Sequence, residues 1–378
     1  MRGHVYRRPT PNGWSRWYAV IDLPAGRDGR RRQRTTTHDT KRDAQAWLAQ
    51  RVQELRAGEV YDTKVTVAEY LVQWLDGKAS LRPSTHFAYT THVQLYLSPH
   101  LGHLRLGDLR AHHVEAMFRE ILAGNHRRER PVGPTTLRRI NATLLSALGT
   151  AVRRGLIRRN PAATVELARA ARPRATAWTP EQLSDFFAAV SKDRLHPLYL
   201  LLGLRGLRRG EAVGLRWSDV DLDAGQLRVE QQVVKVGSQL VIGPPKSHAG
   251  NRTVALDRTT AELLRWHRRR QRLDRWKAET LWVDTGLVFT REDGTGLDPA
   301  YVSRHFDRLV ARHGMPRIRL HDLRHTSASV GLASGETLLE VSRRLGHSSI
   351  AITADVYSHI SPQTAAESAE RLAQLVHP

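Results

Sequence analysis

Apolar residues recur at helical spacing over residues 65–168. Further helices are expected from Pro83 to just before Pro99 and around residues 140–148, and Asn160 with Pro161 closes the segment. The pattern predicts a helical domain at 65–168. Its clearest helix has apolar residues at i, i+3, i+4, i+7 and i+8, which are Val67, Tyr70, Leu71, Trp74 and Leu75.

The first sixty residues predict a three-stranded sheet backed by one helix. Aromatic and β-branched residues at 13–21 and a basic run at 30–37 are typical of strands, and a glycine-containing loop separates them. Apolar residues from Ala44 to Leu55 then share one helical face, and Gly58 follows as a stop signal. A basic strand on a small sheet can lie in a DNA groove or can be a solvated hairpin.

A third unit, of mixed α and β character, is expected at 176–378. Thr179, Pro180 and Gln182 form a helix-start signal. Residues 198–213 predict a helix interrupted by glycines, residues 258–279 a long basic helix, and the chain from Tyr301 onward mostly helices. Strands are expected at 227–234 and 252–256, and a buried strand at Val288-Phe289.

The charge of the chain is strongly positive. Its 378 residues include 59 Lys and Arg against 37 Asp and Glu, a formal net charge of +22. A polyanion would relieve the resulting self-repulsion, and nucleic acid is the leading candidate, although codon bias in a GC-rich genome also enriches Arg. The chain has no cysteine, which excludes disulfides, thiolate nucleophiles and Cys-ligated zinc.

The sequence predicts a soluble protein of the bacterial cytoplasm, acting at the nucleoid and without membrane contact. Its basic first ten residues lack the apolar centre of a signal peptide. The most apolar stretch, around residues 198–204, is too short to span a bilayer.

Four features of the third unit suggest phosphate chemistry. Arg208 is followed three residues later by Glu211, and an Arg within a helix can be oriented by such a carboxylate to grip a phosphate. In Leu320-His321-Asp322-Leu323-Arg324-His325, a helix would place His321 and Arg324 one turn apart, as a proton acceptor beside a phosphate clamp. The remaining two features are Leu345-Gly346-His347 and Tyr357 in Asp355-Val356-Tyr357.

A zinc site is the rival explanation for the second feature. His321-Asp322-x-x-His325 is similar to the H-E-x-x-H zinc helix, with Asp in place of Glu. The shorter side chain would withdraw the general base, and an adjacent Arg would oppose cation binding. Zinc hydrolysis is therefore the weaker hypothesis.

In combination and in order, these motifs resemble the catalytic domain of the tyrosine recombinase (phage integrase) family. The family signature is Arg with an acidic residue three later, a hairpin Lys, H-x-x-R, L-G-H and a Tyr ten residues past that His. Lys246, in Pro245-Lys246-Ser247, matches the hairpin Lys better than Lys235 does. Arg205 lacks the acidic residue three positions on and is set aside. The residues carried over are Arg208, Lys246, His321, Arg324, His347 and Tyr357, with Glu211 in support.

The resemblance implies DNA cleavage and rejoining through a 3′-phosphotyrosyl link, without metal, cofactor or ATP. Arg208 and Arg324 would hold the non-bridging phosphate oxygens, Tyr357 would attack phosphorus, and Lys246 would protonate the departing 5′ oxygen. His321 and His347 would carry a proton and donate a hydrogen bond to the phosphate, in either order.

The resemblance also extends upstream. Leu81-Arg82-Pro83-Ser84-Thr85 is similar to the family's helical core-binding domain, and the first sixty residues to its arm-binding domain. A homotetramer on core and arm attachment sites is implied, with an excisionase (directionality factor) and a host DNA-bending protein as further partners. Candidate DNA contacts outside the catalytic set are Arg30, Arg31, Arg32, Arg34, Arg172 and Arg174.

Integration of a mobile element, with helpers for excision, is the favoured function. A Xer-like chromosome or plasmid resolvase is the main alternative, but such proteins usually lack the arm-binding unit. A non-catalytic DNA binder is a further alternative, although DNA binding alone needs no nucleophile. Residues 362–375 are expected to form a terminal helix that packs on a neighbouring protomer.

Overall fold

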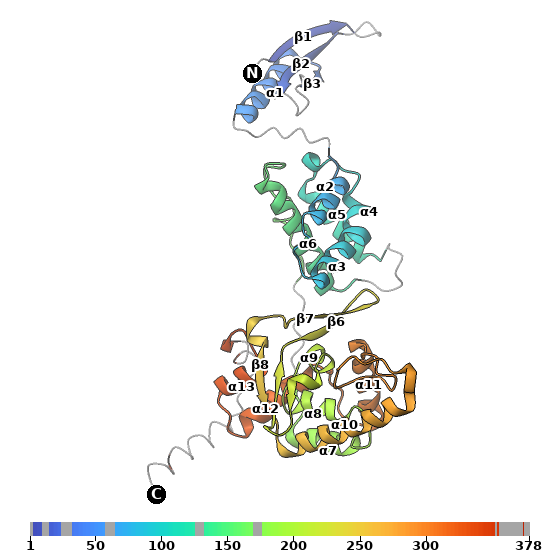
Figure 1. Ribbon diagram of the computed structural model, residues 1–378. Helices are drawn as coiled ribbons and strands as arrows, with labels where there is room; N and C mark the ends of the chain where they lie inside the picture. The colour runs from blue at the N-terminus through green and yellow to red at the C-terminus, as the bar shows by residue number, and fades with distance from the viewer. Residues whose placement is uncertain are drawn as a thin grey trace. The chain divides into compact units, whose positions relative to one another are not determined.

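The computed structural model describes residues 3–9, 15–23, 32–56, 65–124, 132–168 and 176–351, and the single positions 354 and 373 (Figure 1). The chain divides into two compact units, Met1–Ala171 and Arg172–Pro378. The first contains the N-terminal sheet and the helical segment, and the second contains the site.

The N-terminal segment is an antiparallel sheet in the order β1-β2-β3, with one helix against it. Ala19, Val20 and Ile21 of β2 are buried, and Trp47, Leu48 and Val52 of the helix pack against Ile21. The predicted sheet and helix are thus confirmed. Their bounds are β1 Gly3–Pro9, β2 Ser15–Leu23, β3 Arg32–His38 and α1 Lys41–Arg56.

Residues 65–168 are helical, as predicted, around one apolar core. Thr66 caps the first helix in a reciprocal capping box with Glu69, and the phenol of Tyr70 donates a hydrogen bond of 2.6 Å to the Ala147 carbonyl. The elements are α2 Val67–Asp76, α3 Pro83–His92, η1 Val93–Leu97, α4 Ser98–Leu101, η2 Leu106–Asp108, α5 Ala111–Leu122 and α6 Pro134–Arg153.

Two details of this segment differ from the sequence prediction. The second helix does not end before Pro99, because α3 runs through the π-helical turn η1 into α4, where Pro99 lies in the first turn. The wider π turn accommodates the missing proline N–H and the ring. The predicted elements also omit α5, whose buried face holds Val114, Met117, Phe118 and Ile121 between polar residues.

The second unit combines seven α-helices with two small antiparallel sheets in its described residues. One sheet has the strand order β4-β5-β8, and the other is the β6–β7 hairpin. The bounds are α7 Pro180–Ala189, α8 His196–Gly203, α9 Arg209–Val213, η3 Trp217–Asp219, β4 Val220–Asp221, β5 Gln226–Val229, β6 Gln232–Val236, β7 Gln239–Gly243, η4 His248–Gly250, β8 Arg252–Ala255, α10 Arg258–Ala278, η5 Glu279–Leu281, α11 Pro299–Arg312, α12 Asp322–Ala333 and α13 Leu338–Leu345.

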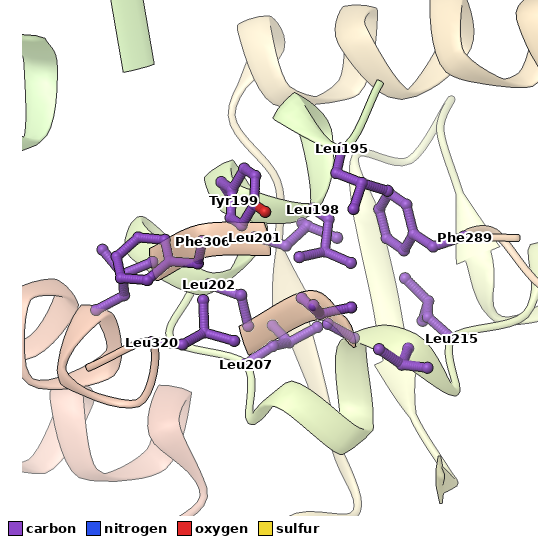
Figure 2. Close-up of a cluster of buried hydrophobic side chains, with 14 of the residues drawn as sticks. Leu195, Leu198, Tyr199, Leu201, Leu202, Leu207, Leu215, Phe289, Phe306 and Leu320 are labelled. Atoms are coloured by element: carbon purple, nitrogen blue, oxygen red, sulfur yellow. The ribbon is translucent and has the colours of Figure 1, made fainter. Parts of the chain in front are cut away.

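The core of this unit surrounds α8, which is buried along its whole length. Figure 2 shows Leu198 and Leu201 of α8 between Phe306 on one side and Phe289 on the other. A helix that is apolar all round belongs at the centre of a domain. Its C-terminal end leads directly into the residues of the site.

The structure also corrects two strand predictions in this unit. The predicted strand 227–234 is two strands, β5 and β6, which belong to different sheets. Val288 and Phe289 are fully buried but form no strand, and isolated bridges at Leu287 and Thr290 flank them. Burial there comes from α10, because His267 of that helix makes a 2.9 Å hydrogen bond with the Val288 carbonyl. Within the described part of the chain, no helix has the length and apolarity needed to cross a membrane.

Candidate active site

Arg208 and Glu211 are held together by the start of α9. Arg208 is the N-cap of this helix and has extended backbone angles, so the expectation that it lies within a helix is wrong. Glu211 accepts hydrogen bonds from the Arg208 backbone N–H at 2.9 Å and from its guanidinium at 2.7 Å. The three-residue spacing therefore reflects helix capping. The Glu211 carboxylate holds both the backbone and the guanidinium of Arg208.

Arg252 shares the same carboxylate and was not among the predicted site residues. Its buried side chain donates hydrogen bonds to Glu211 at 3.0 Å, to the Gly250 carbonyl at 3.0 Å and to the Arg344 carbonyl at 2.6 Å. Burial raises the pKa of Glu211, but Arg252 and Arg208 outweigh this effect and lower it below the ordinary value. Arg252 thus balances the charge that orients Arg208, and a basic residue that opens a strand gave no sign of this role.

Arg324 projects from the first turn of α12 and is buried. Its guanidinium donates hydrogen bonds to the carbonyls of Gly206 and Leu345, which join α12 to the α8–α9 connection and to the end of α13. Burial and the charges of Arg208 and Arg252 lower the pKa of Arg324 to about 9, so it stays protonated at neutral pH.

The end of α13 places His347. Gly346 has φ +67°, and the backbone N–H of His347 bonds to the Ser342 carbonyl at 3.1 Å, which closes the helix as a Schellman motif. The Gly346 carbonyl also accepts a 3.0 Å hydrogen bond from Arg208. The L-G-H motif is therefore a helix stop whose left-handed glycine sets His347 beside the first arginine.

Lys246 is exposed in the connection between β7 and β8, in which Pro245 and Gly250 are buried. A Cβ added at Gly250 would lie 2.6 Å from Pro245 and 3.8 Å from Arg208 Nη1, and one at Gly346 would lie 2.5 Å from the Ala249 carbonyl oxygen. These close approaches hold the segment 245–250 against the site.

Lys235, the other lysine considered for the hairpin, extends from β6. It forms a 2.7 Å ion pair with Asp298, the N-cap of α11. Lys235 is therefore engaged elsewhere in the domain, which favours Lys246 as the site lysine.

Arg205, set aside on sequence grounds, is likewise engaged elsewhere, in a 2.8 Å ion pair with Asp257.

His321 immediately precedes α12, and its ring lies 5.5 Å from the ring of His325. Desolvation and the nearby charges of His325 and Arg324 lower the pKa of His321 to about 4, although one side of the residue reaches solvent. Desolvation with Arg324 and Arg208 lowers the pKa of His347 to about 4 as well. Both imidazoles are neutral at pH 7 before a phosphate arrives, and an anion beside them would raise both pKa values.

The acidic residue of the zinc-like motif has another partner. Asp322 accepts hydrogen bonds from the Arg319 guanidinium at 2.7 and 2.9 Å, so it is engaged rather than available as a general base. Among the described residues, no three His, Cys, Asp or Glu side chains gather as a metal site would require.

The site has an excess of positive charge. In the described part of the chain, two carboxylates, Glu211 and Glu336, face four guanidinium groups that act on one another electrostatically. Within the described residues, the hydrogen bonds of Arg208, Arg252 and Arg324 use fewer N–H groups than a guanidinium has, so further donors remain for an anion. We call the four the arginine cluster: Arg208, Arg252, Arg324 and Arg344.

Several of the predicted site residues are not part of the arginine cluster. Arg34 is exposed on β3 and pairs across the sheet with Ile21, which puts it on the α1 side, whereas Gln33 and Thr35 face the opposite side. Arg32 begins β3, and its side chain is not described. The residues that lie outside the described ranges are Tyr357, Arg30, Arg31, Arg172, Arg174 and, apart from position 373, the expected terminal helix 362–375.

The arginine cluster lies within residues 177–364, which match the model of the phage integrase family. The integrase of Mycobacterium phage L5 is 30% identical over 362 residues, covering 92% of this chain and 93% of the phage protein. The chain belongs to the phage integrase family. A protein named tyrosine recombinase XerC-like from Caldanaerobacter subterraneus is 26% identical over 95% of this chain and 96% of its own.

Solved structures of similar fold include two integrases. The Tn1549 transposon integrase in complex with transposon right end DNA has a TM-score of 0.67 at 20% identity, covering 82% of this chain and 100% of that one. A lambda integrase tetramer bound to a Holliday junction has a TM-score of 0.57 at 19% identity, covering 93% and 94%. The predicted fold class is confirmed, and this phage integrase family member is a tyrosine-type site-specific recombinase.

Proposed function

We propose that this recombinase cleaves DNA by attack of the Tyr357 phenol oxygen on a backbone phosphorus atom held by Arg208 and Arg324. The new bond joins tyrosine to the 3′ phosphate, and the bond to the 5′ oxygen breaks. The observation that carries the proposal is the arginine cluster. Its four positive charges exceed the two negative charges of the neighbouring carboxylates. Preorganised cations of this kind stabilise the charge that develops on the non-bridging oxygens.

Lys246 is the proposed general acid, giving its proton to the departing 5′ oxygen. Its backbone segment packs against Arg208 and Gly346, whereas Lys235 is paired with Asp298. His321 and His347 are neutral at pH 7, so one can accept the phenol proton and the other can donate a hydrogen bond to the phosphate. The reverse reaction uses a 5′ hydroxyl of another strand and needs no ATP.

A substrate with sulfur in place of the bridging 5′ oxygen tests these roles. A thiolate leaves without a proton, so the need for a general acid disappears. Lys246→Ala should slow cleavage of ordinary core-site DNA by roughly 10²–10⁴-fold and restore most of the rate on the sulfur substrate. Covalent protein–DNA adduct on denaturing gels, from the core site at the junction of element and chromosome, is the readout.

Three variants serve as controls. Lys235→Ala should cleave both substrates at the parental rate. Arg208→Ala should be slow on both, by about 10²–10³-fold, because phosphate stabilisation does not depend on the leaving group. Tyr357→Phe should form no adduct. The proposal that Lys246 is the general acid would be refuted if the sulfur substrate failed to restore cleavage by Lys246→Ala. It would also be refuted if Lys235→Ala were slow on ordinary DNA and were restored by the sulfur substrate.

Residues 1–60, 65–168 and 176–378 are the proposed arm-binding, core-binding and catalytic domains. On the face of the N-terminal sheet opposite α1, Gln33 and Thr35 would read base edges, while Arg34 would contact a flanking phosphate. Arg30, Arg31, Arg32, Arg172 and Arg174 are proposed phosphate contacts. Deleting residues 1–60 should spare core-site cleavage and abolish integration, and unimpaired integration would reject the arm assignment.

The assembly we propose is a homotetramer on two duplexes in the bacterial cytoplasm, helped by an excisionase and a DNA-bending protein. The lambda integrase tetramer of similar fold supports the tetramer. A Xer-like resolvase remains the alternative, since the XerC-like relative matches almost the whole chain. Recombination of two identical sites without arm DNA would favour the resolvase.

A further inference from the structure

The long basic helix α10 is fixed on its inner side. Trp217 donates a 2.6 Å hydrogen bond to Gln271, whose amide donates in turn to Thr290 at 2.9 Å. His267 is buried beside them against the Val288 carbonyl. The outer face of α10 is therefore presented by a rigid support.

That outer face carries large apolar side chains in solvent. Trp266 is 46% exposed, Leu273 60% and Trp276 78%. Their spacing along the helix places them on one stripe, opposite the buried residues. The turn that follows adds Leu281, which is 77% exposed. Arg270 lies over the Trp266 ring within this stripe. Several large exposed apolar groups on one helix face are typical of interaction sites rather than of ordinary surface.

A basic pocket of about 750 Å³ borders the stripe. One wall is the α10 flank, with Arg265, Arg268, Arg269 and Arg272, and the other wall is the chain from Ser218 to Asp223 with Gln226 and Arg228. Arg265 is bound to the Leu222 carbonyl at 2.6 Å, and Arg268 lies over the Trp217 ring. Among the described residues, no carboxylate pairs with Arg269 or Arg272.

The apolar stripe and the guanidinium groups of Arg269 and Arg272, which pair with no described carboxylate, together favour a ligand that has both apolar groups and carboxylates. DNA fits less well, because phosphates gain nothing from the exposed Trp276 and Leu273. In Figure 1, α10 also lies along the lower edge of the catalytic unit, while the β6–β7 hairpin lies along the upper edge. A second copy fits less well too, since the chain carries a net charge of +22.

We propose that the outer face of α10 is a docking surface for an acidic amphipathic segment of a partner protein. The apolar residues of the partner segment cover Trp266, Leu273 and Trp276. The carboxylates of the segment enter the pocket and pair with Arg269 and Arg272. Aromatic and Arg side chains together are the usual centres of protein interfaces. The surface is separate from the arginine cluster, so occupancy can recruit or regulate the recombinase without blocking cleavage.

Binding of three synthetic helical peptides to the full-length protein, measured by fluorescence anisotropy, tests the surface. One peptide has Leu and Phe on one face and Glu on its flanks, the second replaces Leu and Phe by Ser, and the third replaces Glu by Lys. We expect the first to bind at least roughly tenfold more tightly than the other two. Leu273→Ala with Trp276→Ala, and separately Arg269→Glu with Arg272→Glu, should each remove that preference.

Matched controls are Val72→Ala, an exposed apolar residue on α2, and Arg312→Glu, an exposed arginine on α11. They should leave peptide binding unchanged, and all variants should cleave core-site DNA at the parental rate. Equal binding of the Ser-substituted peptide, or no binding of the first peptide, overturns the proposal. Weaker core-site DNA binding in the α10 variants would assign the face to DNA. Loss of a concentration-dependent dimer would assign it to a second copy.

Discussion

The helical segment 65–168 and the catalytic unit bury their polar groups in different ways. In the helical segment, buried Thr143 and Thr150 bond to carbonyls one turn earlier on their own helix. In the catalytic unit, buried Glu211 and Arg324 are joined to partners far along the chain. The interior of the helical segment is held by apolar packing and by hydrogen bonds between uncharged groups, such as that from Tyr70 to Ala147. The catalytic unit is held by charges that also leave donors free for a phosphate.

This difference has a cost and a use. Burying ions loses hydration, which the ion pairs and hydrogen bonds of the cluster must offset. An apolar substitute of the same shape would stabilise the fold as well but could not hold a phosphate. The helical segment, which supplies no residue to the proposed chemistry, carries no such network in its described core.

The largest effect is expected when the shared carboxylate loses its charge. Glu211→Gln leaves buried Arg252 without a counter-ion and should lower the free energy of unfolding of the catalytic unit by about 3–5 kcal/mol. Glu262→Gln, in an exposed pair with Arg258, should change it by less than about 1 kcal/mol. Calorimetry that resolves the two units would show this, and equal shifts for both variants would contradict a buried network.

A cavity in the helical segment should cost slightly less and should not affect chemistry. Leu144→Ala, at a fully buried position of α6, should destabilise that segment by about 2–5 kcal/mol. The exposed Val72→Ala is the control, with a change within about 0.5 kcal/mol. At a temperature where the variant is folded, adduct formation at saturating DNA should match the parent. A slower rate there would show that α6 contributes to the active site.

The free energy of unfolding of the catalytic unit should begin to fall at a higher pH than it would if only carboxylates titrated. The pKa values of His267, His321 and His347 are each about 4 in the fold, below the unfolded value near 6.5. The unfolded chain therefore binds more protons, and the stability present above pH 6.5 is lost as the pH falls towards 4. His267→Gln should flatten this dependence in urea unfolding between pH 7.5 and 4.5, and an unchanged slope would argue against it.

Bound DNA should reverse the effect at the two site histidines only. A phosphate raises the pKa of His321 and His347, so core-site affinity should increase as the pH falls from 7.5 to 5.5. His347→Gln should reduce that increase, and His267→Gln should leave it intact, because His267 lies on the buried side of α10 in the core. Equal loss in both variants would show that the pH dependence arises elsewhere.

The smallest effect is expected at Arg205. Its partly buried pair with Asp257 at 2.8 Å should contribute no more than about 1 kcal/mol, and Arg205→Ala should cleave DNA at the parental rate. Adduct formation by Arg205→Ala and Arg208→Ala, side by side, checks which arginine holds the phosphate. A defect in Arg205→Ala as severe as that of Arg208→Ala would exchange their roles.

Local patterns in the sequence determined most of the elements of this protein. The apolar spacing of α2 and the capping signals of α7 depend on residues within one or two turns, and both helices formed where they were predicted. The motif order likewise predicted Arg208, His321, Arg324 and His347, whose charges act on one another in the fold. Patterns of this kind suffice where the cause of a structure lies within a few residues of it.

Only the tertiary structure decided how the site is held. Arg252 meets Glu211 across 41 positions, and Arg208 meets the Gly346 carbonyl across 138. Val288 and Phe289 have strand-like composition but take their place from α10, and Arg208 is a helix cap although its spacing to Glu211 fits a helix interior. A buried charge takes whichever partner the packed core brings within hydrogen-bonding distance, and no periodicity along the chain encodes that partner.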